Sequence, residues 1–125
     1  MAKILKFEDN IEIRENSKEI LELEGHTIIT AENGLVGLKM AYSNLPEIIL
    51  CDIMMPELNG YEVLKELKKN EKTCQIPFIF ISASTESKDL KTALNMGATA
   101  YIKKPFEVEE LVSLIDKCLS GAKTN

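Results

Sequence analysis

Three acidic residues of this chain directly follow short apolar runs that have the length of β-strands. Glu8 and Asp9 come after Ile4–Phe7, and Asp52 comes after Ile48–Cys51. Carboxylates held close together repel one another unless a cation neutralises them. Hard oxygen ligands suit Mg²⁺, which keeps several waters and typically joins one or two carboxylates to a phosphate. The acidic residues therefore predict a divalent-metal site next to a phosphate.

A hydroxyl and an ammonium group follow two later apolar runs. Ser82 comes after Pro77–Ile81, and Lys104 comes shortly after Ala100–Ile102. A lysine supplies a point charge for a phosphate oxygen, and a serine hydroxyl can donate a hydrogen bond to another. Together with Asp52 as a carboxylate nucleophile, these groups are the parts that phosphoryl transfer requires.

Each of these residues has an ordinary role when it is taken alone. Acidic residues at strand–helix junctions often cap helices, which is what we would expect of Glu8 or Asp9 singly. Ser82 alone would be a loop residue and Lys104 alone a surface cation. The set favours chemistry because ligands of an open parallel sheet bind beyond the carboxyl ends of its strands, where all of these residues would meet.

The elements that must position these side chains are visible as an alternation. Short apolar runs are separated by five stretches with helical spacing, of which the third follows Asn59, a good helix cap. Gly25 and Gly97 follow two of the helical stretches, as helix-ending residues do. The runs Ile48–Cys51 and Phe78–Ile81 are continuously apolar, as strands buried on both faces should be. Five rounds of strand and helix predict an α/β fold with a parallel sheet.

Composition limits the class of protein. The 125 residues are 45% hydrophobic and 28% charged, which predicts one globular domain over residues 1–125. A formal charge of −5 with scattered basic residues argues against direct nucleic-acid binding. No apolar stretch has the length of a membrane span. Three cysteines without metal-type spacing do not suggest a disulfide framework, so we expect a reducing, cytoplasmic location.

Ordered motifs run through essentially the whole chain. They are Glu8-Asp9-Asn10, Asp52-Ile53-Met54-Met55-Pro56, Asn59-Gly60, Ser82-Ala83, Gly97-Ala98 with Tyr101, and Lys103-Lys104-Pro105-Phe106. Each motif alone is weak evidence for a family. The ordered set closely resembles the chemotaxis-Y-like receiver domains of response regulators in two-component signalling. The resemblance implies a flavodoxin-like (βα)5 three-layer sandwich whose five-stranded parallel sheet has the order 2-1-3-4-5.

The resemblance also implies roles for the site residues. Asp52 would accept a phosphoryl group from a phosphohistidine of a sensor histidine kinase or phosphotransfer protein. Asp9 and Asp52 would bind Mg²⁺, or Mn²⁺ in its place, with the backbone carbonyl of Met54, and Glu8 would act through water. Ser82 and Lys104 would engage the phosphoryl oxygens, and the Lys104–Pro105 peptide bond would be cis.

A conformational switch is implied in the same way. Phosphorylation would draw Ser82 inward, and Tyr101 would move into the space left behind, remodelling the surface of the fourth helix, fifth strand and fifth helix for a downstream partner. From the residues alone, Tyr101 would be a half-buried strand aromatic with its hydroxyl in water. The resemblance further implies a monomer or a phosphorylation-favoured dimer, and a phosphoacceptor that is not a free-standing enzyme.

Three functions other than phosphate acceptance would each leave a different sequence signature. An aspartate-nucleophile phosphatase would carry Asp-x-Asp after the first strand, where this chain has Glu8-Asp9-Asn10. A flavin or dinucleotide carrier would need a Gly-rich or Ser/Thr-rich phosphate loop there. A degenerate receiver, acting as a phosphorylation-independent binding module, would have lost the acceptor or the acidic pair. Whether the chain stands alone or belongs to a larger regulator is left open.

Some positions depart from the family pattern. Lys6 lies in the first strand, and Asn16 and Ser17 lie in the first helix, where apolar residues are usual. A bare buried ammonium would be costly, so we hypothesise that Lys6 reaches toward a polar patch formed by these two residues. The alternative is an edge-exposed Lys6 without a partner, and in neither case do we expect contact with the phosphorylation residues. Met54 and Ser84 carry no acid or amide that would place an attacking water.

Overall fold

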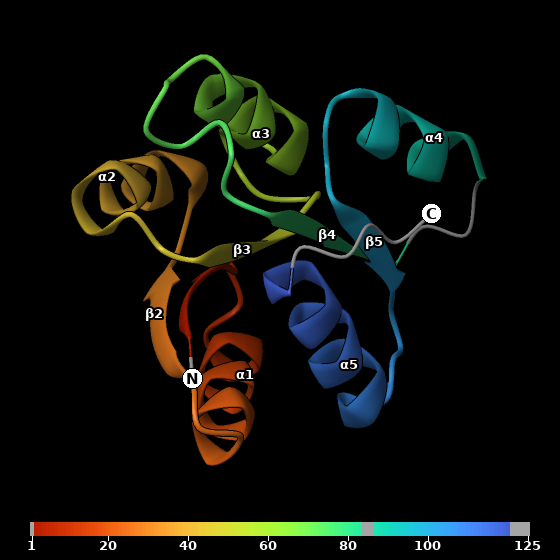
Figure 1. The fold of residues 1–125 in the computed structure, drawn as a ribbon. Coiled ribbons are helices and arrows are strands. Elements are labelled where there is room, and N and C mark those ends of the chain that lie inside the picture. Colours follow the sequence, from red (N-terminus) through yellow and green to blue (C-terminus); the bar gives the residue numbers. More distant parts are fainter. Residues whose placement is uncertain (1, 84–86, 121–125) are drawn as a thin grey trace.

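The computed structural model describes residues 2–83 and 87–120, and Figure 1 shows their arrangement. The strands are β1 (Lys3–Phe7), β2 (Thr27–Ala31), β3 (Ile48–Asp52), β4 (Phe78–Ser82) and β5 (Ala100–Lys103). The helices are α1 (Ile11–Leu23), α2 (Gly34–Asn44), α3 (Gly60–Lys68), α4 (Ser87–Asn95) and α5 (Val108–Leu119). The predicted alternation of strands and helices is confirmed.

The five strands form one parallel sheet in the order β2-β1-β3-β4-β5, which confirms the predicted fold. Strands β3 and β4 each end one residue later than predicted, since they include Asp52 and Ser82. These two polar residues are therefore the last members of the strands, with backbones fixed by the sheet. The sheet therefore fixes the backbone positions from which these two side chains start.

Side chains alternate between the two faces of the sheet, as a strand's period of two requires. In β3, Ile48 and Leu50 pack into one core and Ile49 and Cys51 into the other. Helices α1 and α5 cover the first core, and α2, α3 and α4 cover the second, so the molecule has three layers (Figure 1). Both faces of β3 are buried, which explains its continuously apolar sequence.

Asparagine caps fix where three helices begin. Asn10 Oδ1 accepts a hydrogen bond from the backbone N–H of Ile13 at 3.1 Å, and Asn33 caps α2 in the same way. Asn59 forms a capping box with Glu62, as expected for a helix start. Asn10 therefore caps α1. Neither Glu8 nor Asp9 has the capping role that each would be expected to have on its own.

The sheet order reverses between β1 and β3, and this point positions the candidate site. After β1 the chain enters α1 on one face, and after β3 it enters α3 on the other (Figure 1). The two loops diverge and leave room at the carboxyl ends of both strands, where open α/β sheets bind ligands. Among the described residues, no helix has the length and apolar character needed to cross a membrane.

Candidate functional site

A hollow of about 270 Å³ lies at the carboxyl edge of the sheet. The residues that line it come from the ends of four strands and from the start of α1. They are Glu8, Asp9, Asn10, Ile13, Asp52, Met54, Ser82, Ala83 and Lys104. The structure thus brings together every residue that the sequence placed in the metal and phosphate site, and it adds Asn10, Ile13 and Ala83 to the lining.

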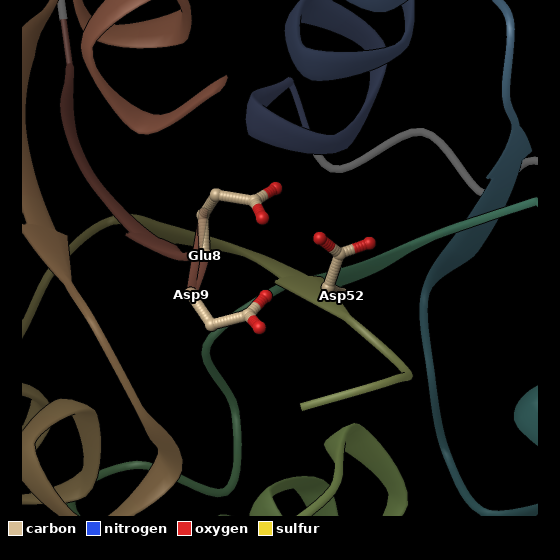
Figure 2. A group of neighbouring side chains, drawn as sticks. All are labelled: Glu8, Asp9 and Asp52. Atoms are coloured by element: carbon tan, nitrogen blue, oxygen red, sulfur yellow. The ribbon is translucent and has the colours of Figure 1, made fainter. Parts of the chain in front are cut away.

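Three carboxyl groups turn toward the same space in this hollow (Figure 2). One oxygen from each of Glu8, Asp9 and Asp52 lies within 4.8 Å of the others. Glu8 and Asp52 are only 2% and 7% exposed, whereas Asp9 is open to solvent. Two buried carboxylates and one exposed carboxylate therefore face a pocket that water and ions can enter.

The environment of Glu8 raises the pKa of its carboxyl group. Burial is the main cause, and hydrogen bonding and repulsion involving Asp52 add to it, while the backbone N–H of Asn10 and the charge of Lys6 oppose it. Asn10 N–H donates to Glu8 Oε2 at 3.2 Å. Oε1 of Glu8 is buried and accepts no hydrogen bond from the part of the chain that the structure describes. This oxygen is oriented to interact with a cation.

Lys104 provides the positive charge nearest to Asp52. Its Nζ lies 3.0 Å from Asp52 Oδ1 and 3.2 Å from Oδ2, and 3.9 Å from Glu8 Oε1. The backbone N–H of Lys104 donates to the carbonyl oxygen of Ser82 at 2.8 Å, which ties the two strand ends together. The Lys104–Pro105 peptide bond is cis. Ser82 is 6% exposed and lines the same hollow.

Lys6 belongs to this charged cluster, which the sequence analysis did not foresee. Its Nζ donates to Ser17 Oγ at 2.7 Å, so the hypothesis of a polar partner on α1 is correct for Ser17 and the edge-exposed alternative is wrong. Nζ also lies 3.8 Å from Glu8 Oε1, so the expectation of no contact with the phosphorylation residues is wrong. Residues two apart on a strand share a face, and this spacing of Lys6 and Glu8 was the available signal.

Four further residues bear on the site or on the surroundings of Lys6. Asn16 is exposed and does not belong to the patch around Lys6. Arg14, which was not singled out, donates from Nη1 to the carbonyl oxygen of Glu8 at 3.0 Å and so braces the end of β1 against α1. Met54 is highly exposed at the rim of the hollow. Ser84 lies outside the described residues.

Tyr101 lies on β5, next to the site rather than in it. Its ring packs partly against the core beneath α2, α3 and α4. The hydroxyl is buried and has no hydrogen-bond partner within residues 2–83 and 87–120, so the expectation of a hydroxyl in water is wrong. The side chain is held by packing of its ring and not by its polar end.

The donor set fits a hard divalent cation. The carboxylates offer oxygen ligands only, one buried oxygen of Glu8 lacks a hydrogen-bond donor among the described residues, and burial together with Asp52 raises the pKa of Glu8. The adjacent ammonium of Lys104 would offset charge on an anion that binds beside the metal. The arrangement can therefore hold a metal and a phosphate together on Asp52.

Comparison with known proteins decides the family. A family model described as the response regulator receiver domain matches residues 4–116. The chain belongs to the response regulator receiver domain family. A receiver domain is a signalling module of two-component systems, and the sequence resemblance to this family is confirmed.

Relatives of this receiver domain agree with that assignment. Response regulator SaeR of Staphylococcus aureus is 37% identical over 123 residues, which are 98% of this chain and 53% of SaeR. The chain spans about half the length of the curated relatives it matches. Among solved structures, the receiver domain of a signal transduction histidine kinase from Syntrophus aciditrophicus is 30% identical with a TM-score of 0.89, covering 100% of this chain and 95% of that one. Chemotaxis protein CheY4 of Vibrio cholerae is 27% identical with a TM-score of 0.88, covering 94% of this chain and 98% of that one.

Proposed function

We propose that this receiver domain accepts a phosphoryl group on Asp52 from the phosphohistidine of a sensor histidine kinase or phosphotransfer protein. The observation that carries the proposal is the position of the Asp52 carboxylate, which ends a central strand 3.0 Å from the Lys104 ammonium inside an acidic hollow. An oxygen of Asp52 attacks phosphorus, the phosphorus–nitrogen bond breaks, and the imidazole nitrogen leaves with the electron pair.

The neighbouring residues have distinct roles in this proposal. Lys104 neutralises charge on the transferred group and orients the Asp52 carboxylate, because its Nζ contacts both carboxylate oxygens. Ser82 donates its hydroxyl to a phosphoryl oxygen from the end of the adjacent strand. Asp52 and Lys104 are already in contact before transfer, so this pair needs little rearrangement.

Asp9, Asp52 and the carbonyl of Met54 would hold Mg²⁺, or Mn²⁺ in its place, and Glu8 would act on it through water. When bound, the metal neutralises negative charge on the phosphoryl group and on the carboxylates. Without it, a phosphate approaching Asp52 meets two further carboxylates in the same hollow. This charge is the reason that we expect phosphorylation to depend on a divalent cation.

We further propose that phosphorylation changes the surface formed by α4, β5 and α5. Ser82 would move toward the phosphoryl group, and Tyr101 would follow into the space that it leaves. The buried hydroxyl of Tyr101 supports this proposal, because a side chain held only by ring packing can change rotamer without breaking a hydrogen bond to the described residues. The remodelled surface would control a downstream partner.

The wider role follows from the same reaction. The phosphorylated domain would store a signal and assist its own phosphorylation and dephosphorylation, without acting as a free-standing enzyme. We expect residues 1–125 to form one domain, working in the cytoplasm as a monomer or as a dimer favoured by phosphorylation. Direct contact with nucleic acid is not expected from its charge of −5.

Incubation with acetyl phosphate and Mg²⁺, followed by measurement of the intact mass, tests the acceptor. The parent should gain one phosphoryl group, and Asp52→Asn should gain none while keeping its circular dichroism spectrum. A parent that stays unlabelled, or a variant labelled to the same extent, would overturn the proposal. An unlabelled parent would instead support a phosphorylation-independent binding module.

The metal requirement is tested with the same assay. Labelling should stop in excess chelator and return when Mg²⁺ or Mn²⁺ is added back. Asp9→Asn should weaken labelling at low Mg²⁺ concentration and recover part of it at high concentration, because it removes one ligand and leaves Asp52 in place. Full labelling in chelator would contradict the assigned metal role.

A further inference from the structure

Besides the partly exposed Lys104, a buried ammonium group lies next to the phosphoacceptor hollow, and the family motifs do not include it. Lys6 is 2% exposed and points from β1 toward α1 and α5, on the same side of the strand as Glu8. Its Nζ donates to Ser17 Oγ at 2.7 Å and lies 3.8 Å from Glu8 Oε1. We propose that Lys6 is a resident cation of the acidic cluster, which partly neutralises Glu8 and thereby weakens the binding of the divalent metal.

The contacts of Glu8 carry this inference. Oε1 of Glu8 accepts no hydrogen bond from the described residues, yet it lies between two ammonium groups, Lys6 at 3.8 Å and Lys104 at 3.9 Å. Both distances exceed hydrogen-bond length, so the interactions are electrostatic and leave the hydrogen-bonding capacity of this buried oxygen unused among the described residues. A metal, or a water bound to it, that approaches Glu8 must do so against the positive charge of Lys6.

Ser17 fixes where that charge lies. A lysine side chain is long and flexible, and an ammonium without a partner would move toward solvent. The 2.7 Å bond to Ser17 Oγ holds Nζ against α1, within range of Glu8, and burial prevents water from screening the pair fully. Ser17 therefore positions the charge, and Lys6 supplies it.

Charge balance gives the direction of the effect. The described cluster holds three carboxylates, Glu8, Asp9 and Asp52, and two ammonium groups, Lys6 and Lys104, with Arg14 contacting only a backbone carbonyl. Removing Lys6 leaves a more negative hollow. A divalent cation should then bind more tightly, whereas the metal-free protein should lose stability because Glu8 keeps fewer compensating charges.

This inference rests on the proposed metal site, so its test begins with the parent protein. Mg²⁺ is titrated into ¹⁵N-labelled protein, and the dissociation constant is read from the amide shifts of residues around the hollow. Lys6→Met keeps an unbranched side chain of similar length and removes the charge. We expect its dissociation constant for Mg²⁺ to fall by about tenfold, the scale of one removed charge at close range in a partly screened site.

Two further variants separate the effect of the Lys6 charge from that of structural disturbance. Lys3→Met removes the same charge from the same strand. The Lys3 ammonium, however, lies at the other end of β1, where it donates to the backbone carbonyl of Asn44. Its Mg²⁺ affinity should stay within about twofold of the parent, because exposed charges beyond a Debye length are largely screened. Ser17→Ala removes the hydroxyl that holds the Lys6 ammonium without changing the net charge, so it should tighten Mg²⁺ binding by less than Lys6→Met does.

The outcomes distinguish the two proposals. If neither the parent nor Lys6→Met binds Mg²⁺, both the metal site and this inference fail. If both bind with equal affinity, the metal site stands and the inference fails, and tightening by Lys3→Met equal to that by Lys6→Met would overturn it as well. If Lys6→Met does not fold without metal, Lys6→Gln in the same titration replaces it, with the same expected direction.

Discussion

At the scale of single residues, the site combines groups that are costly to bury with partners that offset much of the cost. Asp52 forms an ion pair with Lys104. Glu8 accepts a hydrogen bond from the backbone N–H of Asn10 and lies near the ammonium of Lys6. Burial lowers the pKa of the Lys6 ammonium, and the carboxylates of Glu8 and Asp52 oppose this effect. Tyr101 is the contrasting case, since its buried hydroxyl has no partner among the described residues.

The isolated hydroxyl of Tyr101 leads to a stability prediction. Tyr101→Phe should raise the free energy of unfolding by about 1 kcal/mol, because it removes a buried polar group that makes no compensating hydrogen bond. Urea unfolding measures this change as a higher midpoint with an unchanged slope. Tyr42→Phe is the matched control, because Tyr42 is 38% exposed and should have almost no effect. A destabilised Tyr101→Phe would contradict this account of the hydroxyl.

The residues of the candidate site could be predicted from the sequence because their meeting point depends only on their order along the chain. Asp52, Ser82 and Lys104 follow apolar runs, and parallel strands bring such positions to one edge. The ion pair between Lys6 and Glu8 depends instead on where a flexible side chain ends, which no spacing rule fixes. Asn16 was wrongly grouped with Ser17 for a related reason, since adjacent residues on a helix point in different directions.

At the scale of elements, α3 is fixed to the end of β3. The backbone N–H of Gly60 donates to the carbonyl oxygen of Ile53 at 2.9 Å, and Asn59 caps the helix. A Cβ on Gly60 would lie 2.5 Å from the carbonyl oxygen of Asp52, closer than atoms can approach. The sequence revealed the cap through Asn59, but the close approach behind Gly60 depends on packing between separate elements.

Gly60→Ala should therefore affect both stability and phosphorylation. We expect a loss of about 2 kcal/mol in the free energy of unfolding, because the backbone of β3 or α3 must shift to admit the methyl group. The shift reaches Asp52 directly, so labelling by acetyl phosphate should also slow. Chemical denaturation and the intact-mass assay measure the two effects.

Gly25→Ala is the control for this variant. Gly25 has a φ of 92°, and an added Cβ would meet no atom within 4 Å. Its cost should be about 1 kcal/mol, arising from the left-handed backbone alone, and its labelling rate should match the parent. Equal labelling rates in both variants would refute a link between the Gly60 contact and the geometry of Asp52.

At the scale of the whole molecule, the central strands connect the site to global stability. β3 is buried on both faces, and Cys51 lies in it directly before Asp52, with no solvent exposure. Burial, with the charges of Asp52 and Glu8, raises the pKa of the Cys51 thiol well above its usual value, and burial raises that of Cys118. Cys74 lies outside the sheet and is partly exposed.

Thiol labelling should report this difference. At pH 8 a disulfide reagent such as DTNB should react quickly with Cys74, while Cys51 and Cys118 react only when the protein opens, because a buried thiol of raised pKa forms little thiolate. Cys74→Ser should abolish the fast phase and leave the slow one. Rapid reaction at Cys51 in the native state would contradict the packing of β3.

Mg²⁺ should slow the reaction of Cys51 through the stability of the whole domain. A ligand that binds only the folded state lowers the unfolded population by a factor of one plus its concentration divided by its dissociation constant. At ten times the dissociation constant, labelling limited by global opening should slow about elevenfold. Asp9→Asn, with weakened metal binding, should show a smaller effect at the same Mg²⁺ concentration. A slow phase that ignores Mg²⁺ in the parent would mean that Cys51 becomes exposed by an opening in which the metal site stays intact.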